Sequence, residues 1–459
     1  MSFPAYPDYK NSGVEWANEL PAHWKTVALK WVSRIYAGGT PDKSKPYYWE
    51  NGSIPWLNSG AVNQVLISEP SSYITIEAFN SSSASWIPAG SLVIALAGQG
   101  KTKGMVAQLA IKTTCNQSMA AIVPDLPVVS RYLFWWLSSN YQNIRNMAGG
   151  DLRDGLNLEL IGNIAALMPT EAEQTQIARF LDHETARIDA LIEEQQRLIE
   201  LLKEKRQAVI SHAVTKGLDP TVPMKDSGVE WLGEVPAHWV VRRIKHLTEV
   251  ISKGTTPTTI GEDFQDEGIR FLKAENIFGG RVLADPEFFI SERAHAALAR
   301  SALAENDVLV VIAGATTGKS AVLSGDLLPA NTNQAVSFIR LRDTRLSEFI
   351  QCWLSTDAVQ RSISLNSVQS AQPNLSMEDL GEIPVPLPPL DEIDLITDQM
   401  ATQISIFDGL ISEAVNASGL LQERRSALIS AAVTGKIDVR GWQPPASTQA
   451  PESAVAEAN

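Results

Sequence analysis

Residues Ser12–Trp24 read SGVEWANELPAHW, and residues Ser227–Trp239 read SGVEWLGEVPAHW. Ten of these thirteen positions are identical at one constant offset, so that Ser12 corresponds to Ser227 and Trp24 to Trp239. A repeat spacing far above the roughly 20 to 50 residues of solenoid repeats indicates that a whole domain was duplicated. The sequence therefore predicts two copies of one unit. Residues that the two copies share should form the structural framework of the unit. Residues that differ between the copies should account for any difference between their targets.

The duplication extends over most of the chain. Further segments match in the same order, and the offset drifts little, since Asp219 near the end of the first copy corresponds to Asp438. These segments are SLVIALAG at 91–98 and DVLVVIAG at 307–314, Asn116-Gln117 and Asn333-Gln334, and LLKEKRQAVISHAVTKGLD at 201–219 and LLQERRSALISAAVTGKID at 420–438. Insertions are therefore small, and we expect both copies to have the same fold.

Composition places the chain among globular proteins. Its hydrophobic content is 44%, its charged content is 20% and its mean hydropathy is -0.06. The two cysteines, Cys115 and Cys352, occupy non-equivalent positions in the two copies, which excludes a disulfide framework and fits a reducing cytoplasm. The chain has no uninterrupted apolar stretch near the roughly 18 residues of a membrane span, and its first residues lack a signal-peptide pattern. We expect a cytoplasmic protein without a membrane partner.

Each copy begins with a mixed pattern of strands and short helices. Apolar runs bounded by Gly, Asn, Asp or Pro predict strands at 92–96, 308–312 and 335–341. Apolar spacing predicts a short helix over 347–354. These elements indicate an α+β domain built on a curved, mainly antiparallel sheet.

Each copy ends in a long helix. From about Thr170 and from about Pro389, roughly 45 residues contain almost no Gly or Pro and repeat apolar residues in a heptad. The predicted organisation is a first domain at 1–169, a first long helix at 170–216, a second domain at 217–388, a second long helix at 389–438 and a disordered tail at 439–459.

The predicted seam of these helices consists of apolar residues at heptad spacing, related by the offset that links Asp219 to Asp438. They are Ile177, Leu181, Ile188, Leu191, Leu198 and Leu202 in the first helix, and Ile396, Met400, Phe407, Leu410, Leu421 and Leu428 in the second. The alternative is an ordinary amphipathic helix packed on its own domain. A length of ~68 Å, at 1.5 Å per residue, is too long for one small domain to cover. We therefore expect the two helices to pair as a coiled coil.

Connectivity sets the direction of this coiled coil. The first helix ends where the second domain begins, and the second helix begins where that domain ends, so paired helices must run antiparallel. The polar interruptions of the seam should then form register-setting pairs, with Glu184 within about a turn of Arg424 and Gln403 near Lys205. Two domains held at a fixed spacing suit two half-sites on one duplex.

Several motifs occur in combination and in duplicate. They are SGVEW and PAHW before each domain, GGTP at 38–41 and GTTP at 254–257, FLKAENI at 271–277, GATTGKS at 314–320, the Asn-Gln pairs, and the helix ends RQAVISHAVT and RSALISAAVT. In this combination the chain resembles the specificity subunits of type I restriction-modification systems, up to about Arg440. The resemblance implies two tandem α+β target recognition domains separated by the long antiparallel coiled coil. Each domain would read one half of an asymmetric bipartite DNA sequence.

The resemblance also implies partners. These are double-stranded DNA, two methyltransferase subunits that modify adenines, and motor-nuclease subunits in the restriction complex. The chain itself would be non-catalytic and bind no cofactor, with S-adenosylmethionine, ATP and Mg²⁺ on the partner subunits. The sequence agrees in lacking the [DN]PP[YF] and FxGxG patterns of a methyltransferase.

One pattern points instead to nucleotide chemistry. ALAGQGKT at 95–102 and AGATTGKS at 313–320 both satisfy the permissive phosphate-loop pattern. A phosphate loop needs a helix immediately afterwards, but Gly325 and Pro329 follow closely on Ser320. A nucleotide-dependent enzyme is therefore the least favoured alternative. ATP turnover that Lys319→Ala abolishes would revive it.

The same loops suit contact with DNA, because long polar and cationic side chains stand there on a tight backbone. The candidate DNA-binding residues are Gln99, Lys101, Thr102, Lys103, Lys43 and Lys45 in the first copy, and Thr316, Thr317, Lys319, Lys273 and Asn276 in the second. For any one of them, a solvated surface lysine or a turn-forming asparagine is an equally good interpretation. The prediction therefore concerns these candidate residues as a group and not any single one of them.

The charge of the chain limits how it can bind DNA. The net charge is -14, and the pI is about 5.0. Residues 30–165 hold ten Lys and Arg against eight Asp and Glu, and residues 242–384 hold fourteen against eighteen. Neither domain is strongly basic, so the release of counterions from DNA phosphates cannot supply most of the affinity for DNA. We therefore expect weak DNA binding by the isolated chain.

The repeated PAHW segments contain His23 and His238, but no second ligand cluster gives them metal geometry. Because these segments are identical in both copies, they fit a structural role. In that role each Trp would anchor the start of a domain on the end of a helix. A methyltransferase contact is the alternative.

A scaffold that assembles a complex without reading DNA is the main alternative function. Exchange of residues 30–165 with those of a relative should change the methylated sequence only if this domain reads bases.

Overall fold

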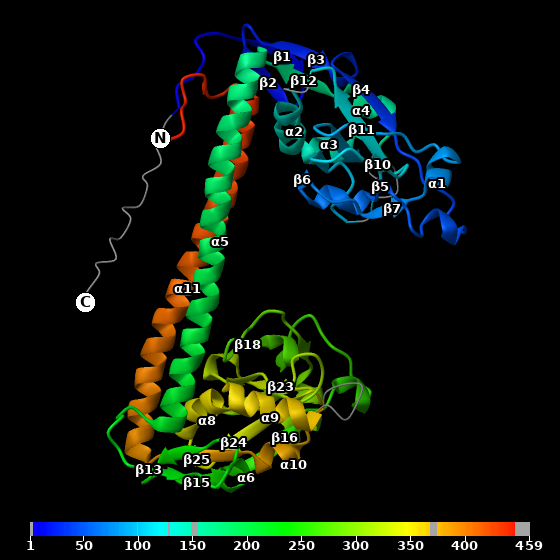
Figure 1. Cartoon of the computed structure of the whole chain (residues 1–459). Coiled ribbons are helices and arrows are strands. Elements are labelled where there is room, and N and C mark those ends of the chain that lie inside the picture. The colour runs from blue at the N-terminus through cyan, green and yellow to red at the C-terminus, as the bar shows by residue number, and fades with distance from the viewer. Residues whose placement is uncertain (1–2, 99, 127–128, 148–154, 368–373, 446–459) are drawn as a thin grey trace, which may run out of the picture. The chain divides into compact units, whose positions relative to one another are not determined.

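The computed structural model describes residues 3–98, 100–126, 129–147, 155–367 and 374–445 (Figure 1). Backbone contacts divide the chain into two compact units, of which the first combines two separate segments and the second is continuous. The first comprises Met1–Gln195 and Ala417–Asn459, and the second comprises Gln196–Asn416. Each unit therefore contains one globular domain together with part of each long helix.

The first domain is built on a five-stranded sheet in the order β4 (Ser33–Ala37), β11 (Met119–Pro124), β8 (Leu92–Ala95), β9 (Val106–Leu109) and β6 (Leu66–Ile67). All neighbours are antiparallel except β6 and β9, which are parallel. A smaller sheet orders β10 (Thr114–Cys115), β5 (Ile54–Leu57) and β7 (Ser72–Ile74).

Both faces of the larger sheet are covered. Leu92 and Ile94 of β8 pack in the core that contains α2 (Val129–Ser139), whereas Val93 and Ala95 pack in a second core beside β5. Alternate side chains of a strand point to opposite faces, so a run with no polar residue indicates a sheet buried on both sides. This explains why β8 reads as a continuous apolar stretch.

The second domain repeats this architecture with one added strand at the edge of its larger sheet. Its larger sheet has the order β16 (Thr248–Lys253), β24 (Val336–Leu341), β21 (Val308–Val311), β22 (Ser320–Val322), β19 (Arg281–Val282) and β18 (Ile277–Phe278). Its smaller sheet orders β20 (Phe289–Ile290), β17 (Ile269–Leu272) and β23 (Ala330–Thr332), and α8 (Leu346–Leu354) covers the larger sheet. The predicted α+β class and mainly antiparallel sheet are confirmed. The predicted strands at 92–96, 308–312 and 335–341 correspond to β8, β21 and β24.

The first long helix, α5 (Glu171–Lys216), has well-defined ends. Thr170 and Glu173 form a reciprocal capping box: the Thr170 N–H donates to Glu173 Oε2 at 3.1 Å, and the Glu173 N–H donates to Thr170 Oγ1 at 3.4 Å. Gly217 follows the helix with a φ of 77°, the left-handed conformation that ends many helices.

The second long helix, α11 (Leu390–Val433), ends five residues before the predicted position 438. Gly435 takes a φ of 73°, so the chain turns away there. The prediction of a disordered tail at 439–459 is wrong for 439–442. Val439 is buried, and the Gln176 side chain donates hydrogen bonds to the carbonyl oxygens of Val439 and Trp442. Residues 446–459 lie outside the described residues.

The two long helices pair in antiparallel fashion within each unit. In the first unit, Arg425 Nε lies 2.7 Å from Asp189 Oδ1, while Ile177 packs in a common core with Val433. In the second unit, Arg206 Nε lies 3.0 Å from Asp408 Oδ1. The two ion pairs are equivalent in the duplication, because Asp189 corresponds to Asp408 and Arg206 to Arg425.

The predicted seam is wrong by one residue at every second position. Leu191, Leu198 and Leu410 are 38%, 42% and 43% exposed. In the central part of each helix, buried and half-buried residues recur at spacings of four and three: Ile188, Ile192, Gln195, Ile199, Leu202 and Arg206 in α5, and Phe407, Ile411, Ala414, Ser418, Leu421 and Arg425 in α11.

The same shift corrects the predicted polar pairs. The seam cations are Arg206 and Arg425, one residue beyond the predicted Lys205 and Arg424. Glu184 contacts His183 and Arg187 of its own helix.

By length and composition alone, α11 could cross a membrane, because one 18-residue window reaches a mean hydropathy of 1.2. Its least exposed residues, however, recur at heptad spacing, and its Asp408 and Arg425 form ion pairs with α5. This is the pattern of a helix paired with another helix.

Candidate functional site

In the first domain, the motifs shared by the two copies converge at the end of the central strand β8. Gly38 N donates to Met119 O at 3.1 Å, and Gly39 N donates to Cys115 O at 2.8 Å. Leu96 N, just beyond β8, donates to Ser118 O at 2.8 Å. The GGTP loop and the Asn-Gln loop therefore meet beside the segment that follows β8.

The second domain repeats this arrangement. Gly254 N donates to Val336 O at 3.2 Å, and Ile312 N donates to Ala335 O at 2.8 Å. A Cβ at Gly254 would lie 1.8 Å from Thr332 O, and a Cβ at Gly38 would lie 2.2 Å from Cys115 O. Glycine is required at both positions because two backbones approach closely. The shared motifs thus form a framework that holds the loop after the central strand.

That loop has the same closure in both copies. Gly104 N donates to Ala95 O at 2.9 Å, and Gly318 N donates to Val311 O at 2.8 Å. Both glycines have positive φ, 86° and 94°. Strand β22 starts at Ser320, so a strand follows this loop where a phosphate loop requires a helix. The geometry therefore disfavours the nucleotide-binding alternative.

The four candidate residues in the first loop have different environments. Lys101 is exposed, and Thr102 is half-buried. Lys103 is only 4% exposed, so its burial disfavours the predicted DNA contact in this conformation. Gln99 lies outside the described residues.

In the second loop, Lys319 carries the exposed charge. Its Nζ lies 5.4 Å from the centroid of the Phe278 ring. Thr317 Oγ1 donates to Gly314 O at 2.7 Å within the loop, and Thr316 is half-buried. Lys319 therefore remains the strongest candidate in this loop.

The two lysines after GGTP also differ. Lys43 is exposed. Lys45 Nζ lies 3.4 Å from Tyr48 Oη and 5.0 Å from the centroid of the Tyr48 ring, and this hydrogen bond raises the pKa of Lys45. Lys45 therefore keeps its charge at neutral pH.

The candidates in FLKAENI are structural residues. Asn276 is 1% exposed, its Oδ1 accepts from Lys273 N at 2.9 Å, and its Nδ2 donates to Leu283 O and Pro286 O at 3.0 and 2.9 Å. Lys273 Nζ lies 3.2 Å from the centroid of the Phe288 ring. The prediction that this pair contacts DNA stays a prediction. Asn276 supports the turn, and Lys273 packs on an aromatic ring.

The second unit contains a cavity of about 880 Å³ beside Lys319. Phe278, Gly279, Gly280 and Arg281 line it on the domain side, together with residues of α5 and α11. Glu348 also lines it; burial raises the pKa of this carboxyl group, and Arg281 opposes that rise. Phe278 and Arg281 are not among the residues predicted from the sequence, although FGGR is typical of a two-residue turn between strands.

The PAHW segments form the junction between each domain and the long helices. His23 Nε2 lies 2.8 Å from Glu173 Oε1 in the first turn of α5, and His238 Nε2 lies 2.7 Å from Glu392 Oε2 in the first turn of α11. Burial opposes ionisation of Glu173, but hydrogen bonds from His23 and Thr170 lower its pKa below the usual range.

The tryptophans of PAHW lie against glycines that follow the long helices. A Cβ at Gly435, after α11, would lie 3.2 Å from the Trp24 ring, and one at Gly217, after α5, would lie 3.3 Å from the Trp239 ring. Each Trp therefore anchors the start of a domain on the end of a helix. Among the described residues, no cluster of His, Cys, Asp or Glu could hold a metal ion.

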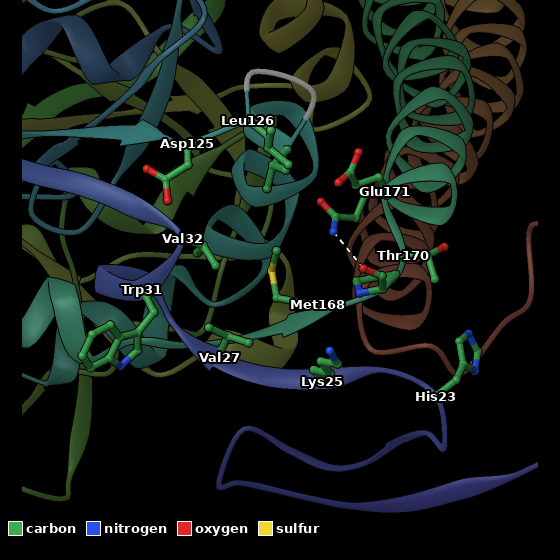
Figure 2. Close-up of a pocket in the computed structure, with 13 residues that line it drawn as sticks. His23, Lys25, Val27, Trp31, Val32, Asp125, Leu126, Met168, Thr170 and Glu171 are labelled. Carbon is green, nitrogen blue, oxygen red and sulfur yellow. Dashed lines mark hydrogen bonds between the residues drawn. The ribbon is translucent and has the colours of Figure 1, made fainter.

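A second pocket, of about 390 Å³, lies at this junction in the first unit. Figure 2 shows it between the segment of Lys25 and Val27 and the first turn of α5, with Met168 on its wall. Gln174 Nε2 donates to Pro169 O at 2.8 Å. The residues that line this pocket include none of the DNA-binding candidates.

Comparison with known proteins supports the duplication and identifies the family. A profile described as the type I restriction modification DNA specificity domain matches residues 21–202 and again 236–417. The two matches are related by the same offset that links Ser12 to Ser227.

The specificity subunit of the Escherichia coli type I restriction enzymes EcoR124I and EcoR124II is 31% identical over 187 residues, which are 40% of this chain and 46% of that protein. That match thus spans about half the length of the relative. The specificity subunit of the E. coli EcoDI enzyme is 22% identical over 454 residues, which are 93% of this chain and 91% of that protein.

Solved structures show the same fold. A chain from a study of the assembly and conformational transition of a type I restriction-modification system has a TM-score of 0.71, with 91% of this chain and 99% of that chain covered. The HsdS subunit of Thermoanaerobacter tengcongensis has a TM-score of 0.53, with 91% and 98% covered. At 16% identity, both likenesses concern the fold alone. Two profile matches that cover most of the sequence show that the chain belongs to the type I restriction-modification DNA specificity domain family, with two copies of that domain.

Proposed function

We propose that the chain is the DNA specificity subunit of a type I restriction-modification complex. Each domain reads one half of an asymmetric bipartite target, and the chain docks two adenine methyltransferase subunits. One observation carries this proposal. In each copy, shared glycine and Asn-Gln motifs hold the loop after the central strand, while the side chains at the exposed positions beside that loop differ. A constant framework with a variable surface suits two readers of different sequences.

The paired helices would act as spacer and docking surface in this assembly. The equivalent ion pairs, Asp189 with Arg425 and Asp408 with Arg206, give each unit the same helix register. Repeated geometry of this kind supports two equivalent docking positions for two copies of one partner.

The chain has a non-catalytic role in this proposal. S-adenosylmethionine would bind to the methyltransferase subunits, and ATP and Mg²⁺ would bind to motor-nuclease subunits when the complex restricts DNA. Such a complex would act in the cytoplasm, where its double-stranded DNA substrate is found.

A domain exchange tests the proposal. Residues 30–165 are replaced by those of a relative with another specificity, and methylated adenines are mapped across the genome. We expect one half of the methylated motif to change and the other half to stay the same. Exchange of residues 242–384 should have the reciprocal effect, and it serves as the matched control. If both chimaeras methylate the original motif, the chain is a scaffold that does not read bases.

A further inference from the structure

A short exposed run occurs at the same place in both copies. It comprises Asn63–Leu66 in the first domain and Phe278–Arg281 in the second, which correspond under the offset that links Ser12 to Ser227. A buried residue anchors each run: Val62 is 1% exposed and Ile277 is 3% exposed. In each copy the shared framework thus ends at this buried residue. The exposed side chains that follow it differ between the two copies.

The run lies at the edge of the larger sheet. Leu66 pairs in parallel with Gln108 of β9, and Arg281 pairs in parallel with Val322 of β22. In the second domain the run also reaches the loop after the central strand, because Lys319 Nζ lies over the Phe278 ring. The candidate lysine and the exposed run therefore form one surface.

In the second domain this run is a β-hairpin. Phe278 of β18 pairs with Arg281 of β19 across Gly279 and Gly280, whose φ values are 61° and 82°. Two central residues with positive φ give the tight turn whose twist matches that of the flanking strands. A two-stranded ribbon of this kind fits the major groove of B-DNA.

The exposed side chains of this ribbon suit base edges and phosphates. Phe278 is 63% exposed, and Arg281 and Lys319 are also exposed. Neither cation forms an ion pair with any residue in the described parts of the chain. An Arg can donate two hydrogen bonds to guanine O6 and N7, and a Phe can contact the methyl group of thymine.

The first copy has different exposed side chains at the equivalent positions. Asn63 and Gln64 are exposed, and Val65 and Leu66 are each 50% exposed. Asn and Gln are the side chains that make paired hydrogen bonds to adenine N6 and N7. The two copies would thus differ in base preference through one loop on a common scaffold.

We propose that this run is the base-reading element of each domain. In the second domain, Arg281 contacts guanine and Phe278 contacts a thymine methyl group in the major groove, while Lys319 contacts a phosphate. In the first domain, Asn63 and Gln64 contact adenine. This inference rests on the proposed function, because it assumes that the domains read DNA. Two cations beside the exposed ring favour a polyanion over a protein partner.

Base analogues test the proposal in the complete complex with its methyltransferase subunits. In the second half-site, uracil replaces thymine, which removes only the methyl group, and 7-deazaguanine replaces guanine, which removes only N7. With the natural chain, we expect each substitution to weaken binding, by about fourfold for the methyl group and about tenfold for N7. Phe278→Ala should abolish the uracil effect alone, and Arg281→Ala should abolish the 7-deazaguanine effect alone.

The first half-site gives the reciprocal measurement. There 7-deazaadenine should weaken binding by the natural chain, and the variants Asn63→Ala and Gln64→Ala should remove that effect. The same variants should leave the analogue effects in the second half-site unchanged.

Two controls separate base reading from other contributions. Lys319→Ala should weaken binding equally for all sequences and reduce the salt dependence by about one ion. Leu365, an apolar side chain that is 77% exposed elsewhere in the second domain, should tolerate replacement by Ala without effect on binding.

Three results would overturn the proposal. Analogue effects that persist unchanged in the variants would show that the run does not touch the bases. Loss of methyltransferase subunits from the complex of Phe278→Ala would make the run a protein-docking surface. If exchange of residues 242–384 changes the motif while the analogue effects stay the same in the variants, the proposed function stands and this inference fails.

Discussion

Glu173 performs two tasks at the start of α5. Its Oε2 accepts hydrogen bonds from Thr170 N and Thr170 Oγ1 at 3.1 and 2.9 Å, and its Oε1 lies 2.8 Å from His23 Nε2. The residue therefore caps the helix and attaches the PAHW segment of the first domain to it.

Loss of this carboxylate should destabilise the first unit. We expect Glu173→Ala to lower the free energy of unfolding by about 1 to 2 kcal/mol, because a capping interaction and a hydrogen bond to His23 are lost. Glu173→Gln keeps the capping geometry without the charge, so its effect should be smaller. Chemical denaturation followed by tryptophan fluorescence measures both, and Glu392→Ala is the matched variant in the second unit.

The effect of Glu173 should also depend on pH. Its pKa is lower in the folded state than the usual value of 4.5, so its contribution to stability is present above that value and is lost as the pH falls through the folded-state pKa. The stability difference between the natural protein and Glu173→Gln should therefore shrink towards acid. A difference that stays constant down to pH 3 would contradict this assignment.

Individual contact residues were the part of the site that the sequence predicted least well. Asn276 has the chemistry of a base reader, but folding uses both polar atoms of its side chain for the turn. Phe278 was missed because an apolar residue in a strand pattern is usually buried. Exposure depends on the edge position of β18, which requires knowledge of strand order.

At the scale of elements, the long helices show what a heptad pattern can predict. Their existence, starting points and antiparallel direction followed from the repeat and from connectivity. The phase of the seam did not follow, because α5 has adjacent apolar residues at Leu191 and Ile192 and again at Leu198 and Ile199. Either residue of each pair completes a regular heptad, and only packing against the partner helix distinguishes them.

Paired substitutions test the phase of the seam. Ile199 is half-buried towards the partner helix, whereas Leu198 is 42% exposed. We expect Ile199→Ser to lower the free energy of unfolding by about 1 to 2 kcal/mol, and Leu198→Ser to have an effect within about 0.5 kcal/mol. Denaturant titration of the two variants provides the comparison. A larger loss for Leu198→Ser would restore the phase predicted from the sequence.

At the scale of the whole molecule, charge governs DNA binding. The chain carries a net charge of -14, and neither domain is a basic block. We expect the isolated chain to bind its target only weakly, with tight binding after methyltransferase subunits are added, because partners must supply much of the phosphate contact. Fluorescence anisotropy with a labelled duplex at fixed salt measures both states. Nanomolar, sequence-specific binding by the chain alone would contradict this prediction.

The duplication made the α+β class and the equivalence of the two domains predictable, because two copies of one pattern restrict the possible folds. The unit boundaries were less accessible. The first compact unit combines residues from the beginning and the end of the chain, and both limits of the second unit lie inside the long helices, so neither limit coincides with a break in composition. Val433 and Val439, for example, complete the core of the first domain from the far end of the chain.

This interleaving has a consequence for biosynthesis. The second unit has all of its residues once the ribosome has passed Asn416, whereas the first still lacks Ile429 and Val433 at that moment. The domain translated earlier is therefore the later of the two to close its core, because its apolar face stays uncovered until residues 429–439 have been translated. A nonsense mutation near codon 417 would leave the second unit whole and the first one unfinished.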